Sequence, residues 1–147
     1  MTDRAPDAAA APQPRVAASF ARQTLMATLR AELLEVAPGR VVIAAPLQEG
    51  FRQQQGAGHA GVTFALGDSA AGYAALSLMP ADREVMTVEM KINLLAPAVG
   101  LRLVATGAVI RAGRRLVVVR AGVVAERDGA APVAVAEMMG TMIPVDA

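Results

Sequence analysis

The chain has 147 residues and a mass of 15.1 kDa, a length typical of a single domain. Hydrophobic residues make up 54% of it and aromatic residues only 3%, and the formal net charge is +1. Few rings for base stacking and no basic excess argue against a nucleic-acid partner. Cysteine is absent and histidine occurs once, which excludes disulfides, thiolate chemistry and multi-histidine metal sites. We expect no metal and no cofactor.

The mean hydropathy of +0.42 raises the question of a membrane span. The longest weakly charged stretch, 60–80, contains Asp68, and an acid inside a span costs at least about 2.5 kcal/mol. We therefore expect a buried core helix and no membrane partner. Residues 1–14 have no signal-peptide pattern, and their Ala/Pro-rich composition predicts a disordered tail. The prediction is a cytoplasmic protein with one folded domain, 15–147.

Hydrophobic periodicity predicts a short amphipathic helix that begins at Val16 and ends near Met26. A polar, Gly-rich loop precedes a long apolar helix, which Pro80 should stop. The other expected elements are strands 29–36 and 40–46, loop 48–58, helix 59–78, and strands 84–95, 101–110, 115–126 and 132–143. A turn is expected at Ala37-Pro38-Gly39, and tight hairpin turns are expected at Ala112-Gly113 and Asp128-Gly129.

This order places four strands after the long helix and does not alternate strands with helices. The sheet should therefore be mostly antiparallel and the fold class α+β. The long helix is apolar nearly all round, so it must be wrapped by the sheet or covered by a partner. We expect a sheet curled around one central helix, with a second subunit covering what the first leaves bare.

Asp68 is the only charged residue between positions 60 and 79. A carboxylate among apolar and small residues is costly to desolvate, so its pKa should be raised. One interpretation is that Asp68 faces a solvated edge or caps a helix break near Gly67. The other is that the carboxylate does acid–base or nucleophilic work in a cleft.

A Gly-rich segment, 53–61, leads into this helix. Gly56 and Gly61 would let a substrate approach the backbone closely. The free N–H groups at the start of a helix favour negative charge, including the oxyanion that develops in acyl transfer. The alternative is a flexible loop with a helix cap, in which His59 orients the loop by hydrogen bonding.

Together, Gln53, Gly56, His59, Gly61 and Asp68 form the pattern Q-x-x-G-x-x-H-x-G-x(6)-D. This pattern and the small-residue helix after it resemble the PaaI-type hotdog-fold acyl-CoA thioesterases. The segment 87–98 and the Val-rich hairpin near 112–114 are similar to the same family, so that the resemblance covers about residues 17–144. It implies a hotdog fold and the hydrolysis of an acyl-CoA to a free acid and CoA.

The resemblance also implies roles for individual residues. The N–H of Ala60, where relatives commonly have glycine, would hold the thioester oxygen, and Asp68 would act as general base or as nucleophile. Gln53 would position the carbonyl or the water. Thr87 would help to hold that water, unless it is an ordinary strand residue. His59 belongs to the same motif, and its chemical role stays open.

The resemblance places the site at a dimer interface, so that Asp68 would act with the loop of a partner subunit in a homodimer or homotetramer. Arg111, Arg114 and Arg115 flank one hairpin. Their planar guanidinium groups suit the phosphates of CoA, but they could equally be solvated surface charges. Scarce aromatic residues and several methionines suggest an adaptable acyl pocket and do not name the acyl group.

Two other functions stay open. An enoyl-CoA hydratase of the hotdog fold would pair its aspartate with a histidine a few residues later in the same helix, whereas His59 precedes Asp68. A non-catalytic acyl-CoA-binding protein would have no need for Gln53, His59 and Asp68 together.

Overall fold

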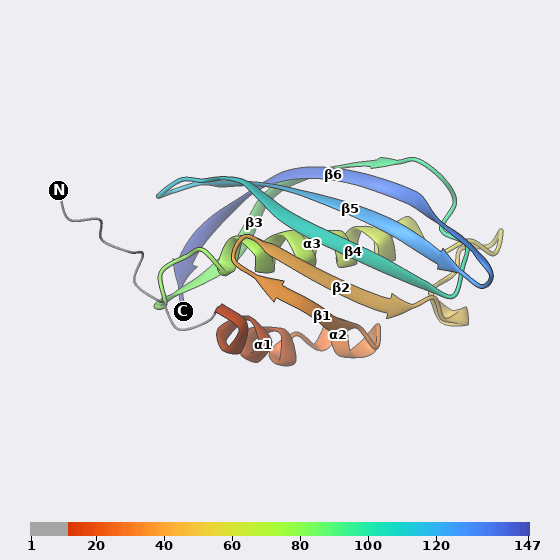
Figure 1. The fold of residues 1–147 in the computed structure, drawn as a ribbon, viewed down its shortest axis with the longest axis horizontal. Coiled ribbons are helices and arrows are strands. Elements are labelled where there is room, and N and C mark those ends of the chain that lie inside the picture. The colour runs from red at the N-terminus through yellow and green to blue at the C-terminus, as the bar shows by residue number, and fades with distance from the viewer. Residues whose placement is uncertain (1–11) are drawn as a thin grey trace.

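The computed structural model describes residues 12–147, in which three helices accompany a single curved sheet (Figure 1). The helices are α1 (Pro12–Arg22), α2 (Thr24–Thr28) and α3 (Ala60–Leu76), and a short 3-10 turn, η1, covers Glu49–Phe51. The strands are β1 (Glu32–Ala37), β2 (Arg40–Pro46), β3 (Arg83–Leu94), β4 (Arg102–Ala112), β5 (Val117–Arg127) and β6 (Ala130–Asp146). None of the helices in the described range is long and apolar enough to cross a membrane.

All six strands form one antiparallel sheet in the order β1-β2-β4-β5-β6-β3. The sheet curves over α3, and five of its strands contact that helix (Figure 1). Helix α1 packs against β1, at one edge of the sheet. The structure confirms the α+β class and the antiparallel sheet wrapped around a long central helix.

Side-chain alternation along β5 shows how the sheet covers α3. Val117, Val119 and the next three odd-numbered residues are buried, whereas the residues between them are half-buried or exposed. This is the period of a strand with one face on the core. Small residues then bring the helix close to that face. A Cβ on Gly107 of β4 would lie 2.2 Å from the backbone of Ala70, so glycine is needed where helix and sheet meet.

Helices α1 and α2 are separate because Gln23 between them has an extended backbone, with φ −82° and ψ 97°. The sequence predicted one continuous helix here, and that prediction is wrong. The segment docks on α3 through Phe20, whose ring meets Tyr73 edge-on with the ring centroids 6.0 Å apart.

Arg15 of α1 caps the C-terminal end of α3. Its guanidinium donates hydrogen bonds to the carbonyl oxygens of Leu76, Met79 (2.9 Å) and Pro80 (2.6 Å). The last carbonyl groups of a helix have no partner within the helix and carry partial negative charge, so a cation there is stabilising. This contact joins residues more than sixty positions apart.

Some predicted boundaries differ from the structure. Strand β1 begins at Glu32 and not at residue 29, because Leu29 caps the C-terminal end of α2 and Arg30 turns the chain with φ 52°. Helix α1 begins at Pro12, so residues 12–14 are helical and not part of a tail. The rest of the predicted tail, residues 1–11, lies outside the described residues.

The connection between β4 and β5 is also longer than predicted. The expected tight turn at Ala112-Gly113 is a four-residue link, 113–116, which is closed by a hydrogen bond from the Gly113 N–H to the Leu116 carbonyl. Arg115, predicted at the start of a strand, therefore lies in this link. The predicted turn at Asp128-Gly129 joins β5 to β6 directly.

Strand β3 is the second edge of the sheet and pairs only with β6 in the part of the chain that the structure describes. Met86 and Val88 on this strand are 57% and 58% exposed. Unpaired backbone groups beside exposed apolar side chains are typical of an edge that another chain covers.

Candidate active site

Asp68 of α3 and Thr87 of β3 meet beside the helix. Thr87 Oγ1 donates a hydrogen bond to Asp68 Oδ1 at 2.8 Å and lies 3.2 Å from the Met142 sulfur. Asp68 is half-buried and lies within the regular turns of α3, so it does not cap a helix break near Gly67. Its partner comes from a strand 19 residues later in the chain.

A β-bulge lies next to this pair. The register between β3 and β6 shifts between Thr87 and Glu89, so Val88 is the extra residue. A bulge interrupts the alternation of side chains and re-aims its neighbours. Thr87 therefore reaches Asp68 while the next side chain, Val88, remains exposed at the edge of the sheet.

Burial raises the pKa of the Asp68 carboxyl, and the hydrogen bond from Thr87 opposes that rise because it stabilises the carboxylate. Burial is the larger effect, so the pKa lies above the usual value of an aspartate. A carboxyl with a raised pKa in a cleft is suited to accept a proton during a reaction near neutral pH.

His59 caps the start of α3. Its backbone is extended, with φ −61° and ψ 138°, and its Nδ1 accepts a hydrogen bond from the Gly61 N–H at 2.8 Å. The His59 carbonyl accepts from Val62 and Thr63. The N–H of Ala60 has no acceptor within residues 12–147. Because the first N–H groups of a helix carry partial positive charge, this N–H can bind an oxyanion.

Gln53 lies beside this helix terminus. Its Oε1 accepts a hydrogen bond from the Gln55 N–H, which leaves the amide nitrogen as the end that can donate to a ligand. Gly56, at φ 91°, donates its N–H to the Gln53 carbonyl and closes the loop in a conformation that favours glycine. Gln53 and Ala60 line one cavity of about 400 Å³.

Asp68 and Thr87 line a different cavity, of about 600 Å³. Asp68 follows Ala60 by eight residues on the same helix, which separates them by about 12 Å along the axis. A single carbonyl group cannot contact both in one chain. The structure therefore pairs Gln53 with Ala60, and Asp68 with Thr87, but does not bring the two pairs together within one subunit.

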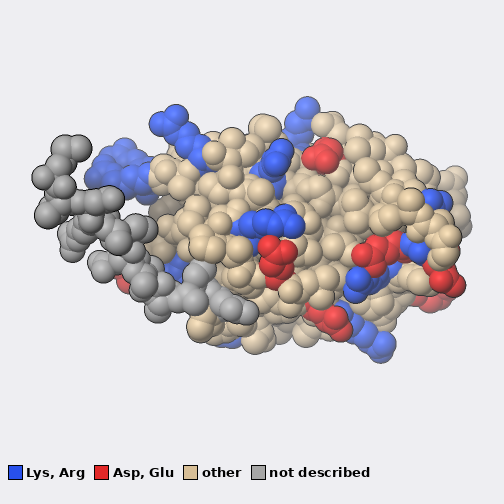
Figure 2. Space-filling model, in the orientation of Figure 1, with Lys and Arg blue, Asp and Glu red and all other residues tan. Residues whose placement is uncertain are grey.

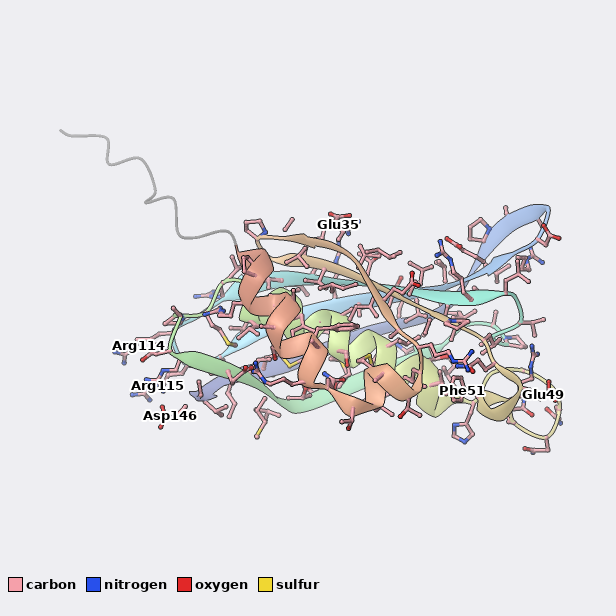
Figure 3. The ribbon with its side chains drawn as sticks, turned by 90° about the horizontal axis from the view of Figure 1, so that it is seen from below. Glu35, Glu49, Phe51, Arg114, Arg115 and Asp146 are labelled. Atoms are coloured by element: carbon pink, nitrogen blue, oxygen red, sulfur yellow. The ribbon has the colours of Figure 1, made fainter. Side chains whose placement is uncertain are left out.

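The three predicted CoA-binding arginines are exposed around the β4–β5 link. Figure 3 places Arg114 and Arg115 at the end of the molecule opposite Glu49 and Phe51, which precede Gln53 in the chain. Figure 2 shows positive side chains at the end where the β4–β5 link lies, and mixed charges over the rest of that face.

Strand pairing fixes how far this link lies from the acid. Thr87, Met142, Val117 and Ala112 are paired in turn across four neighbouring strands. Three strand spacings amount to about 14 Å. The arginines of a subunit are therefore on the same side of the molecule as its own Asp68, and not near its own Gln53.

Sequence reasoning missed part of the cavity beside Asp68. Gln23, Ser69 and Tyr73 line it together with Asp68. Two features of the sequence could have indicated these residues. Gln23 is a polar residue that interrupts the apolar period of the first helix, and Tyr73 is the only tyrosine of the chain. Within the described residues, no group of three or more acidic or histidine side chains is placed to hold a metal ion.

The model of the thioesterase superfamily matches residues 55–131, about half of the chain. The chain belongs to this superfamily. The matched segment contains His59, Ala60, Asp68 and Thr87, which belong to the candidate site, but not Gln53. No curated protein shows a significant sequence match.

Three solved structures are similar to this chain. A thioesterase family protein from Silicibacter pomeroyi is 42% identical with a TM-score of 0.90, and the alignment covers 92% of this chain and 99% of that one. A Staphylococcus aureus thioesterase, solved as a glutamine-to-alanine variant, is 23% identical with a TM-score of 0.75 and coverage of 82% and 98%. The Escherichia coli PaaI protein from the phenylacetic acid degradation operon is 19% identical with a TM-score of 0.81 and coverage of 91% and 93%. The fold is the hotdog fold, and the family supports a hydrolase of the thioesterase type.

Proposed function

We propose that this protein hydrolyses an acyl-CoA thioester to a free acid and CoA. The observation that carries the proposal is the N–H of Ala60, which is free at the start of α3 beside the amide of Gln53. A thioester oxygen bound there would gain the Ala60 N–H, the Gln53 amide and the positive end of the helix dipole. These interactions strengthen as negative charge develops on the oxygen in the transition state.

Asp68 supplies the other half of the chemistry. Its carboxylate takes a proton from the attacking water, or it attacks the carbonyl carbon itself. In the second route the C–S bond breaks and CoA leaves as the thiolate, and water then hydrolyses the resulting anhydride to the free acid. Thr87 holds the carboxylate or the water in place. Both routes need Asp68 in its charged form. His59 acts as a positioning residue, because its Nδ1 engages the Gly61 N–H and leaves the N–H of Ala60 unused. An imidazole engaged in this way offers no support for the hydratase alternative.

The two halves come together if two copies pair through the β3 edge. A two-fold axis that joins two β3 strands antiparallel reverses the ends of the two subunits, so the Gln53 loop of one approaches the Asp68 side of the other. The exposed apolar residues Met86 and Val88 on β3 support this arrangement. We therefore propose a homodimer with two shared sites, and a homotetramer if two such dimers associate.

The same geometry supports a role for the arginines. Arg111, Arg114 and Arg115 lie about three strand spacings from Thr87, within reach of the CoA phosphates when the thioester lies at Asp68. We propose that they bind those phosphates. Because acyl-CoA thioesters are intracellular metabolites, we also propose that the enzyme acts in the cytoplasm.

The related structures offer one further support. Solved variants of the Staphylococcus aureus thioesterase replace a glutamine and a glutamate that lie fifteen positions apart. Gln53 and Asp68 have the same separation, and aspartate supplies the same carboxylate as glutamate on a shorter side chain.

A thiol-release assay with a panel of acyl-CoAs tests the proposal. The panel contains phenylacetyl-, hydroxyphenylacetyl-, benzoyl- and C4–C12 straight-chain CoA esters. Asp68→Asn should abolish thiol release and leave CoA binding largely intact, whereas the control Asp82→Asn, at an exposed position outside both cavities, should keep full activity. Thiol release by Asp68→Asn at the wild-type rate would refute the assignment of Asp68. Loss of enone absorbance from crotonyl-CoA without thiol release would indicate a hydratase.

A further inference from the structure

The cavity beside Asp68 has a polar far end that the hydrolysis of a thioester does not require. Ser69 Oγ donates to Gln23 Oε1 at 3.0 Å, and Gln23 Nε2 donates to Tyr73 Oη at 3.0 Å. Ser19 Oγ lies 3.5 Å from Tyr73 Oη and 3.4 Å from Glu84 Oε2. All five residues line the cavity. A row of hydrogen-bonding groups therefore runs from α1 over α3 to β3.

Gln23 has one hydrogen-bond donor to spare in this row. The side-chain amide carries two hydrogens, and it uses one of them on Tyr73. The second has no acceptor among residues 12–147. Turning the amide around does not change this count, because its nitrogen would then donate to Ser69 alone. Gln23 is half-buried and Tyr73 only 4% exposed, so an apolar ligand filling the cavity would leave that donor unpaired at a cost.

The charges at this end of the cavity are already paired. Arg22 Nη2 and Glu84 Oε1 form an ion pair at 2.9 Å. The free group that remains is the neutral amide of Gln23. Because this amide carries no positive charge to compensate a carboxylate, it favours a neutral oxygen on the ligand. Gln23 bonds to Ser69, one residue after Asp68, and to Tyr73, five residues after it. Its amide therefore reaches up to about 7.5 Å from Asp68 along the axis of α3, a span of up to about six bonds in an extended acyl chain.

We propose that Gln23 is a specificity-determining residue that binds a neutral oxygen on the distal part of the acyl group, so that oxygenated acyl chains are preferred over plain alkyl chains of the same length. Ser69 and Tyr73 act as positioning residues, because their hydroxyl groups orient the Gln23 amide. This inference rests on the proposed thioesterase function and names the acyl class that the site selects.

Two substrates of equal length test the proposal. In 6-hydroxyhexanoyl-CoA an oxygen stands where heptanoyl-CoA has its terminal methyl group. The wild-type enzyme should prefer the hydroxylated ester by about tenfold or more in kcat/KM. Gln23→Met, which keeps the length of the side chain, should reduce this ratio to about one or reverse it. The ratio compares two substrates on one enzyme preparation, so a variant that is merely less well folded does not change it.

Two further variants keep the test decisive. Tyr73→Phe preserves the ring that packs against Phe20 and removes only the hydroxyl that orients Gln23, so it should lower the ratio without abolishing hydrolysis. Thr24→Val is the matched polar-to-apolar control, because Thr24 is the next residue, is exposed and does not line the cavity. It should leave the ratio unchanged.

The possible failures can be told apart. If no acyl-CoA releases thiol, the proposed function fails and this inference fails with it. If hydrolysis depends on Asp68 but Gln23→Met leaves the ratio unchanged, only this inference is overturned. If Gln23→Met raises KM equally for all CoA esters but not for N-acetylcysteamine esters of the same acids, the cavity holds the pantetheine arm, which also overturns it.

Discussion

Replacing Ala60 with proline removes the proposed oxyanion donor with little other change. Ala60 is the first residue of α3 after the cap His59, and its N–H makes no hydrogen bond within residues 12–147. Proline is favoured at this helix position because no N–H is needed there. The φ of −61° and ψ of 138° at His59 also match the extended conformation required before proline. The fold should therefore accept Ala60→Pro with a stability change of at most about 0.5 kcal/mol.

The catalytic effect should be far larger than the effect on stability. Loss of one oxyanion donor costs about 2.7–4 kcal/mol of transition-state stabilisation, or about 10²–10³ in kcat. The assay is thiol release under saturating substrate at pH 7.5, with thermal melting of the same samples. Ala60→Val keeps the N–H and adds bulk, so it serves as the control for crowding by the proline ring.

The two variants together decide the outcome. Strongly reduced kcat in Ala60→Pro with an unchanged melting temperature, beside an active Ala60→Val, supports an oxyanion donor at this position. If Ala60→Pro keeps more than about a tenth of the wild-type kcat, the reasoning from the free N–H is wrong. Equal losses in both variants would point to steric blockage and would also refute it.

Three more measurements test the other parts of the site and the fold. Activity needs the Asp68 carboxylate and should fall as the pH drops through its raised pKa. Thr87→Val removes the hydrogen bond that lowers this pKa, so the acidic limb of the pH–rate profile should move to higher pH. A shift to lower pH would contradict the pairing of Thr87 with Asp68. Inactive Ala60→Pro and Asp68→Asn subunits, mixed and refolded together in equal amounts, should recover about a quarter of wild-type activity, because half the dimers are mixed and each has one intact site; no recovery would argue for a site within one chain. Arg15→Met should lower the free energy of unfolding by about 1–2 kcal/mol in a urea titration, and an unchanged midpoint would show that the cap on α3 adds nothing.

The proposal of a site shared between subunits rests on the rigidity of α3. The oxyanion donor needs the start of a helix, where N–H groups are free, whereas the acid needs partial burial to raise its pKa, which the middle of the helix provides. One straight helix cannot place both at one carbon atom. Two helices related by a two-fold axis can, and the proposed pairing would cover the exposed β3 edge with Met86 and Val88.

The cavity at Gln23 depends on the break between α1 and α2. A continuous helix would carry residue 23 past α3, whereas the extended backbone at Gln23 lets its side chain bond to both Ser69 and Tyr73. The hydrogen bonds of Gln23 with Ser69 and Tyr73 also stabilise the break between α1 and α2. Substrate selection and the docking of the N-terminal helices thus depend on the same side chain.

Features that depend on neighbours in the chain could be predicted from the sequence. The spacing of Gln53, His59 and Asp68 predicted a loop, then the start of a helix, then an acid inside that helix. Helical geometry converts residue number directly into position, so the place of Asp68 along the helix could be predicted. The turn at Asp128-Gly129 was equally readable, since its conformation depends on the residues that form it. The α+β class followed from the order of the elements.

Contacts between residues far apart in the chain could not be predicted in this way. Thr87 reaches Asp68 because a bulge in β3 re-aims it, and Gln23 breaks a helix because α3 offers partners 46 and 50 residues away. The predicted strand 29–36 begins before the observed strand, because the chain turns at Arg30 although the apolar pattern around it is typical of a strand. The two separate cavities, one beside the free N–H of Ala60 and one beside Asp68, also depend on the packing of the whole fold. Local pattern fixes periodicity and spacing along the chain, but contacts across the sheet depend on register, and register is set by the packing of the whole fold.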